Sequence, residues 1–203
     1  MKIFCIGRNY TEHAKELNNA VPTSPVFFMK PDTALLKHNQ PFYIPDFSQN
    51  VHYEVELVYK ICKVGKNIDV KFASRYYKEI ALGIDFTARD LQDVAKSKGL
   101  PWEVAKAFDN SAVLSEFISL DSLKNKENIE FSLEKNGTLV QHGFSNDMIF
   151  PIDQLIAYLS RFFTMKIGDM IYTGTPAGVG PVAIGDELCG KIEGKEFFNF
   201  KIL

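Results

Sequence analysis

The stretch “NVHYEVELVYK”, residues 50–60, constrains the fold of this chain more than any other segment. Its alternating apolar residues are Val51, Tyr53, Val55, Leu57 and Tyr59. A period of two is typical of a strand whose side chains point in turn to two faces of a sheet. The second face then carries Glu54 and Glu56, about 6.5–7 Å apart along the strand. Like charges at that distance repel unless water or a cation lies between them, so this face is either solvated or half of a metal site.

Short extended segments outnumber helical ones along the rest of the chain, and the two kinds do not alternate regularly. Helices are predicted at residues 9–17, 88–98 and 152–163. This pattern predicts an α+β fold, rich in β-structure, and excludes a doubly wound sheet. The length of 203 residues is enough for one sizeable core, so we predict a single domain over residues 1–203.

Local signals mark where several of these elements begin or turn. Asn136–Gly137 is the preferred pair for a type I′ turn, which predicts a hairpin over residues 129–141. Asn9 precedes Glu12 by three residues, the spacing of a capping-box variant at the first helix. Residues 87 and 90, Thr and Asp, have the same spacing ahead of the second helix.

Composition limits the kinds of partner. A net charge of −2 gives no electrostatic footprint for nucleic acid or an anionic membrane, and no apolar run approaches the roughly 20 residues that span a bilayer. The three cysteines form no CxxC pair, and the N-terminal segment has no secretory pattern. We therefore expect a cytoplasmic protein whose partner is a small molecule.

A third carboxylate adds to the pair at residues 54 and 56. Asp85 ends the apolar run “IALGIDF”, where a bare charge would be costly to bury without partners. If Glu54, Glu56 and Asp85 converge, they suit a hard cation with oxygen ligands, such as Mg²⁺, with Mn²⁺ or Ca²⁺ as substitutes. The alternative is that the two glutamates face solvent, as strand residues commonly do.

Two further segments carry groups suited to acid–base chemistry. His13 and Glu16 are three residues apart on the first predicted helix, so they share a face, and the glutamate can fix the imidazole tautomer. A polar loop follows directly, so residues from about 10 to 24 could form a lid over a substrate. Lys106 lies among apolar residues and could stabilise an oxyanion or a carboxylate. Both features have a plain alternative, an exposed polar pair and a surface lysine.

The glycine-rich stretch “YTGTPAGVGP” lacks the ending of a phosphate-binding loop, so nucleotide binding is rejected. Its backbone N–H groups and Thr175 could still hold a carboxylate or a carbonyl oxygen. An ordinary turn explains the glycines equally well.

Seven stretches together resemble the fumarylacetoacetate hydrolase family, and in particular its short acylpyruvase and oxaloacetate-decarboxylase branch. They are “IGRNYTEHAKEL”, “PVFFMKP”, “HYEVELVY”, “GIDFTARDLQ”, “KGLPWEVAKAFD”, “SNDMIFPIDQLI” and “IYTGTPAGVGPV”, which lie between residues 6 and 182. The resemblance implies a mixed β-roll or sandwich with peripheral helices, usually a homodimer.

The resemblance also implies roles for particular residues. The metal ligands would be Glu54, Glu56 and Asp85, holding Mg²⁺ or Mn²⁺. The catalytic groups would be His13, Glu16 and Lys106, and the substrate contacts would be Arg8, Gln92 and Thr175. The substrate would be a 2-oxo acid.

The implied reaction is metal-dependent hydrolysis of a carbon–carbon bond in an acylpyruvate, with decarboxylation of oxaloacetate as a related activity. A tautomerase of oxaloacetate, or of a hydroxymuconate-type diacid, is the alternative, because the same enolate would form by loss of a proton. A non-catalytic acid-binding module and a Schiff-base enzyme that uses Lys106 remain rival hypotheses.

Overall fold

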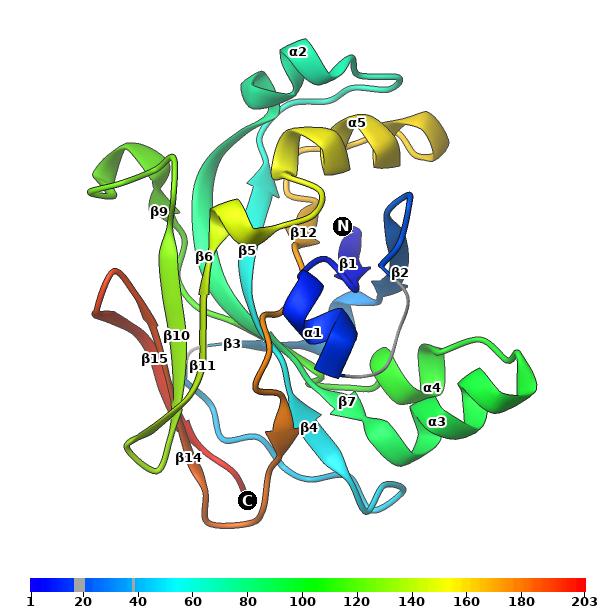
Figure 1. Ribbon diagram of the computed structural model, residues 1–203, viewed down its shortest axis with the longest axis vertical. Coiled ribbons are helices and arrows are strands. Elements are labelled where there is room, and N and C mark those ends of the chain that lie inside the picture. Colours follow the sequence, from blue (N-terminus) through cyan, green and yellow to red (C-terminus); the bar gives the residue numbers. More distant parts are fainter. Residues whose placement is uncertain (17–20, 38) are drawn as a thin grey trace.

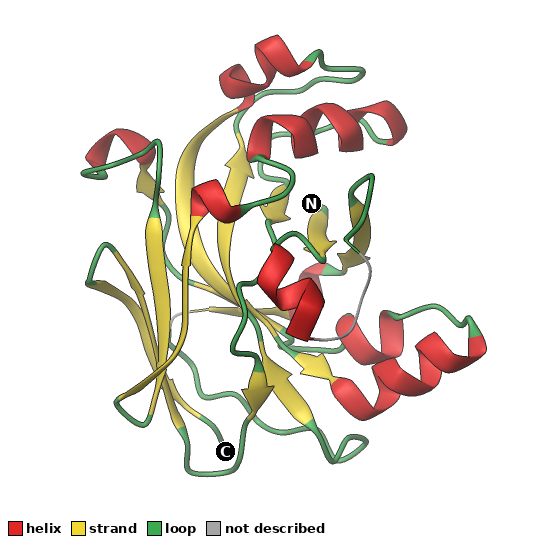
Figure 2. Ribbon diagram, in the orientation of Figure 1, coloured by secondary structure: helices red, strands yellow, loops and turns green. Residues whose placement is uncertain are grey.

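The computed structural model describes residues 1–16, 21–37 and 39–203. Three sheets form the body of the molecule, and the helices lie around them (Figures 1 and 2). The helices are α1 (Thr11–Glu16), α2 (Val70–Ala73), α3 (Arg89–Lys98), α4 (Glu103–Lys106) and α5 (Ile152–Phe162). Short 3-10 turns are η1 (Asp32–Ala34), η2 (Ser74–Tyr76), η3 (Leu120–Ser122) and η4 (Ser145–Asp147).

An eight-stranded mixed sheet is the largest element. Its strands are β1 (Ile3–Gly7), β2 (Val26–Lys30), β3 (Leu35–Lys37), β5 (Val55–Ile61), β6 (Tyr77–Asp85), β8 (Ala112–Leu114), β9 (Ile118–Ser119) and β12 (Met170–Tyr172). They pair in the order β2-β1-β12-β5-β6-β8-β3, with β9 also on β6. The pairs β1–β12 and β3–β8 are parallel and the others are antiparallel. The strand order places β2 at one edge of the sheet.

Two smaller sheets complete the body. The four-stranded sheet, ordered β11-β10-β14-β15, consists of β10 (Glu130–Lys135), β11 (Thr138–Phe144), β14 (Glu187–Ile192) and β15 (Lys195–Lys201). The three-stranded sheet, ordered β13-β4-β7, consists of β4 (Val51–Tyr53), β7 (Thr87–Ala88) and β13 (Gly180–Pro181).

The main core unites side chains of the large sheet with those of the four-stranded sheet and with α5. Phe131 and Phe198 come from the four-stranded sheet, Leu57 and Leu82 from the large one, and all four are buried. The predicted class, a β-rich α+β fold of β-roll type with peripheral helices, is therefore confirmed. The prediction of a single domain over residues 1–203 stays a prediction.

The stretch that opened the sequence analysis is two strands, not one. β4 ends at Tyr53 and β5 begins at Val55, and the two belong to different sheets. The alternation continues through the break, so the apolar residues on both sides are buried. Glu54 therefore lies where the chain passes from the small sheet into the large one.

The predicted hairpin is present, but both predicted capping boxes are wrong. Asn136 and Gly137 have positive φ angles of 53° and 74° at the turn between β10 and β11, as a type I′ turn requires. Asn9 bonds to residues 150 and 173 instead of α1, and Asp90 accepts from Ser48 and from the N–H of Gln49. Asn9 thus bonds to distant residues, and Asp90 bonds to distant residues and to the neighbouring Leu91 N–H in place of residue 87. The predicted lid, about residues 10–24, contains α1, and residues 17–20 lie outside the described part of the chain.

Gly83 offers a direct test of packing in the large sheet. A Cβ atom there would lie 2.5 Å from Tyr172 Cε1 and 2.6 Å from the carbonyl oxygen of Val113. Gly83→Ala is therefore expected to lower the free energy of unfolding by about 3 kcal/mol. Gly7→Ala is the control, because the nearest atoms to a Cβ there are 4.0 Å away. Equal midpoints of chemical denaturation for the two variants would contradict this packing.

Candidate active site and metal centre

Three carboxylates meet where β4, β5 and β6 end or begin. Glu56 is in β5, Asp85 is the last residue of β6, and Glu54 lies just before β5. The Asp85 N–H donates to the Glu54 carbonyl at 2.8 Å, which fixes the two backbones side by side. One oxygen of each carboxylate lies within 4.8 Å of the others, and the three residues are no more than 5% exposed. The alternative that the two glutamates face solvent is therefore wrong.

Buried cationic side chains compensate two of the three carboxylates. Lys106 Nζ donates to Glu54 Oε2 at 2.7 Å, to Asp85 Oδ2 at 2.8 Å and to Thr87 Oγ1 at 2.5 Å. Arg89 donates to Glu54 Oε1 at 2.6 Å. Burial alone would raise the pKa of Glu54, but attraction to Lys106 and Arg89 outweighs it and holds that pKa well below its usual range.

Lys30 completes the set of cations. Its Nζ lies 2.7 Å from Asp85 Oδ1 and donates to the carbonyl and hydroxyl oxygens of Ser111, each at 2.9 Å. The contact with Asp85 is an ion pair without the alignment of a hydrogen bond, so Oδ1 is a buried oxygen that lacks a well-directed donor. Such an oxygen keeps a lone pair for another ligand.

Glu56 is the carboxylate with the least compensation. Its Oε2 accepts the Gly174 N–H at 2.6 Å, and no cationic side chain among the described residues forms an ion pair with it. Burial, and then repulsion from Asp85 and Glu54, raise the pKa of Glu56 well above its usual value. A buried carboxylate without a cationic partner is costly, and a metal ion would remove that cost.

The residues present therefore fit a divalent cation. Glu54, Glu56 and Asp85 would hold it through carboxylate oxygens, which are the ligands that Mg²⁺ and Mn²⁺ prefer. When bound, the cation would act as a Lewis acid toward a substrate oxygen.

The predicted dyad is formed on α1. His13 Nδ1 lies 3.3 Å from Glu16 Oε2, and both Glu16 carboxylate oxygens accept the Gly178 N–H at 3.2 Å. The imidazole is buried, and burial lowers the pKa of His13 despite the nearby carboxylates of Glu54 and Glu16. A neutral imidazole with Nδ1–H toward the glutamate leaves Nε2 free to accept a proton.

A narrow cavity of about 30 Å³ joins these groups. Eight of the nine predicted site residues line it, namely Arg8, His13, Glu54, Glu56, Asp85, Gln92, Lys106 and Thr175. Glu16 reaches it through His13. The structure thus brings the whole predicted set together, while the role of each residue stays a prediction. The open space is the size of one or two waters, so α1 or side chains must move to admit a substrate.

Sequence reasoning missed three residues that organise the site. Arg89 donates to Gln92 at 2.7 Å, an i,i+3 pair that helical spacing could have revealed. Gln141 accepts from the Val55 N–H at 2.9 Å and donates to Thr175 Oγ1 at 2.8 Å, from a strand with no local signal. Lys30 gave no signal either, because lysines are seldom buried.

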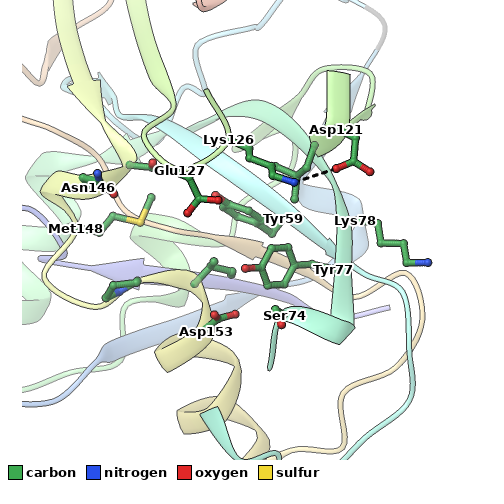
Figure 3. A pocket seen from close by; sticks show the side chains of 14 residues that line it. Tyr59, Ser74, Tyr77, Lys78, Asp121, Lys126, Glu127, Asn146, Met148 and Asp153 are labelled. Atoms are coloured by element: carbon green, nitrogen blue, oxygen red, sulfur yellow. Dashed lines mark hydrogen bonds and ion pairs between the residues drawn. The ribbon is translucent and has the colours of Figure 1, made fainter. Parts of the chain in front are cut away.

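A larger cavity, of about 540 Å³, lies elsewhere and contains none of the predicted site residues (Figure 3). Tyr59 of β5 and Tyr77 of β6 line it on one side. Met148, just after η4, and Asp153, in the first turn of α5, also line it. Size alone would therefore have pointed to the wrong part of the molecule.

Residues 2–199 match the family model described as fumarylacetoacetate (FAA) hydrolase C-terminal. The chain belongs to the fumarylacetoacetate hydrolase family. The resemblance inferred from the sequence is thereby confirmed. Membership of this family supports the prediction of an enzyme, while hydrolysis of a carbon–carbon bond stays a prediction.

Two curated relatives in this family are named for oxaloacetate. The chain is 45% identical to “Oxaloacetate decarboxylase, mitochondrial” of Dictyostelium discoideum over 191 residues, which cover 93% of this chain and 88% of that protein. It is 44% identical to “Oxaloacetate tautomerase YcgM” of Escherichia coli K12 over 194 residues, 95% of this chain and 89% of that protein.

Among solved structures, the chain is similar to the fumarylpyruvate hydrolase of Pseudomonas aeruginosa in complex with Mn²⁺ and pyruvate. The TM-score is 0.95 and the identity 34%, over 100% of this chain and 89% of that one. A divalent cation thus occurs in a member of the family with the same fold. In the described part of this chain, no helix is long and apolar enough to cross a membrane.

Two isosteric variants should separate the roles of the glutamates in the metal-free protein. Glu54→Gln leaves Arg89 without its buried counter-charge and Lys106 with Asp85 alone, so we expect it to lose about 3 kcal/mol of stability. Glu56→Gln removes a poorly compensated charge, so its stability should equal or exceed that of the wild type.

Calorimetric titration and chemical denaturation would measure these effects. Both variants should bind Mg²⁺ at least 100-fold more weakly than the wild type. Wild-type Mg²⁺ affinity in either variant would remove that glutamate from the ligand set.

Proposed function

We propose that this chain is a divalent-cation-dependent oxaloacetate tautomerase, which interconverts the keto and enol forms. This was the alternative reading of the sequence, and the relatives support it better than acylpyruvate hydrolysis. Tautomerisation moves one proton between C3 and the 2-oxo oxygen and needs no attacking water. The reaction therefore requires a proton acceptor, a polarised oxo group and a site for a dicarboxylate.

The charge balance of the cavity is the observation that carries the choice of substrate. Three cationic side chains, Lys30, Lys106 and Arg89, pair directly with the carboxylates and offset their charge. Arg8 and Lys96 also line the cavity, and among the described residues neither forms an ion pair with these carboxylates. A divalent cation would add two positive charges, so the occupied site complements a small dianion such as oxaloacetate.

His13 is the group best placed to move the proton. Its imidazole is buried in the cavity wall, and Glu16 orients Nδ1, so Nε2 can accept a proton from C3 or return it. Arg8 would bind one substrate carboxylate, with Gln92 and Thr175 as neutral contacts. All three N–H donors of Lys106 already have partners. We therefore propose that Lys106 holds Glu54 and Asp85 in position.

Hydrolysis of an acylpyruvate is the second candidate. The same fold in the Pseudomonas aeruginosa fumarylpyruvate hydrolase supports it. In that reaction His13 would accept a proton from water instead of carbon. The volume of the cavity does not distinguish the two substrates, because parts of the site must move to admit either one.

Rate measurements on the two substrate classes test the proposal. With Mg²⁺, the protein should accelerate the interconversion of enol and keto oxaloacetate, followed by ultraviolet absorbance, without a matching release of pyruvate. EDTA should abolish the acceleration. Metal-dependent pyruvate release from acylpyruvates at a higher kcat/KM would assign the hydrolase instead, and pyruvate release from oxaloacetate would assign the decarboxylase.

Replacing the proposed proton acceptor should remove the activity but not the fold. We expect His13→Ala to lower kcat for tautomerisation at least about 100-fold, the usual contribution of a positioned base. His142→Ala is the matched control, because that imidazole is exposed and pairs with Glu130 on the hairpin. A His13→Ala enzyme within fivefold of wild type would remove His13 from the mechanism.

The pH dependence should report the imidazole. Because burial lowers the pKa of His13, kcat/KM should hold at neutral pH and fall only below about pH 6.5, as the ring becomes protonated. The Glu16 carboxylate stabilises the protonated ring, so Glu16→Gln should move this acidic limb to lower pH as well as reduce the rate. A pH–rate profile of both proteins would check the sign, and a shift to higher pH would contradict it.

A homodimer and a cytoplasmic location also remain proposals. The edge strand β2 carries half-buried apolar residues, Val26 to Met29, which a second copy could cover. Light scattering on the purified protein would give its mass in solution.

A further inference from the structure

Asn9 lies between the end of β1 and the start of α1, and its side chain is fully buried. Nδ2 donates to the carbonyl oxygens of Thr173, at 2.7 Å, and Phe150, at 3.1 Å, and Oδ1 accepts the Phe150 N–H at 2.8 Å. The Asn9 carbonyl oxygen accepts the Ile149 N–H at 2.8 Å. One residue therefore joins the root of α1 to two segments more than 140 positions away.

One of these segments also holds a predicted metal ligand. Thr173 Oγ1 donates to the carbonyl oxygen of Leu57 at 2.9 Å, and the next residue, Gly174, donates its N–H to Glu56 Oε2. Gly174 has a φ of 94°, and a Cβ there would lie 2.8 Å from Asn9 Cβ. Asn9 thus packs directly against Gly174, the residue whose N–H binds Glu56.

The residue before Asn9 has an unfavourable backbone conformation. Arg8 has a φ of 59°, in the left-handed region that residues other than glycine seldom adopt. Its conformation ends β1 and directs the chain into α1, while Arg8 itself lines the cavity. A strained backbone conformation persists only when the surrounding structure holds it. The hydrogen bonds of Asn9, the next residue, are the ones adjacent to Arg8.

We propose that Asn9 is a positioning residue: it fixes Arg8, and the root of the helix that carries His13 and Glu16, relative to Glu56. Asn9 does not line the cavity, so it acts through these neighbours and not on a substrate. The part of this inference that concerns rate rests on the proposed function, and the part that concerns Arg8 does not.

Rates of folded variants test the positioning role. Asn9→Ala should lower kcat for tautomerisation at least tenfold, measured at a temperature where every variant is folded. Mg²⁺ affinity should stay within threefold, because the carboxylates are held from β5 and β6. Asn136→Ala is the control: it removes two side-chain hydrogen bonds, to Asp186 and Glu187, at the distant hairpin turn, where Asn9→Ala removes three, and it should keep kcat within twofold. A folded Asn9→Ala enzyme with kcat within twofold of wild type would overturn the proposal.

A double-mutant cycle tests the link to Arg8 without any activity. Glycine adopts a φ of 59° without strain, so Arg8→Gly should make the bonds of Asn9 less necessary. The loss of melting temperature caused by Asn9→Ala should therefore be smaller in Arg8→Gly than in the wild type, by at least 2 °C. Equal losses in the two backgrounds would show that Asn9 does not hold Arg8 and would overturn that part.

These experiments distinguish failure of the proposed function from failure of the positioning role of Asn9. If the wild type does not act on oxaloacetate, the proposed function fails, and the unfolding cycle alone decides the link between Asn9 and Arg8. If Asn9→Ala does not fold, Asn9→Ser, which keeps a short hydrogen-bonding group, takes its place in both experiments with the same expected directions.

Discussion

The burial of three carboxylates beside one another is the constraint on which the rest of this structure depends. Removing such groups from water costs several kcal/mol each, and like charges add to that cost. Lys106 spans Glu54 and Asp85, Arg89 compensates Glu54 and Lys30 compensates Asp85, while Glu56 retains a single backbone donor. This imbalance is why the residues fit a cation: a bound cation would supply the compensation that the chain leaves out at one of the three positions.

The architecture follows from bringing these charges together. The chain changes sheets at Glu54, so that Glu54 at this junction and Glu56 in β5 lie close to the point where β6 ends with Asp85. Lys30 arrives from the edge strand β2, and Lys106 from the short helix α4. Each cation therefore fixes a peripheral element to the centre through its charge. Loss of Glu54 would leave Arg89 without its charged partner, and loss of Asp85 would do the same to Lys30.

The same arrangement explains how one fold can serve related reactions in its family. A neutral imidazole, a cationic wall and a cation site suit any 2-oxo acid that loses a proton or a carbon substituent next to its oxo group. In the mechanism proposed here, the reactions would differ in the atom that meets His13. The bonds of Asn9 before α1 and of Glu16 at its end tie this helix to the segments around the cavity.

Local patterns were enough to predict the β-rich class, the hairpin turn at Asn136–Gly137 and the candidate site residues. Alternation and turn preference act within a few residues, and the nine candidate residues lay in motifs that could be identified. Which polar groups are buried, and what they contact, follows from the packing of the sheets and could not be inferred from local patterns. Asn9 had the spacing of a local helix cap, but its side chain bonds to distant residues. Lys30 gave no local sign that it is buried against Asp85. Hydrogen bonds and ion pairs between distant segments depend on how the sheets pack, and no local pattern encodes that.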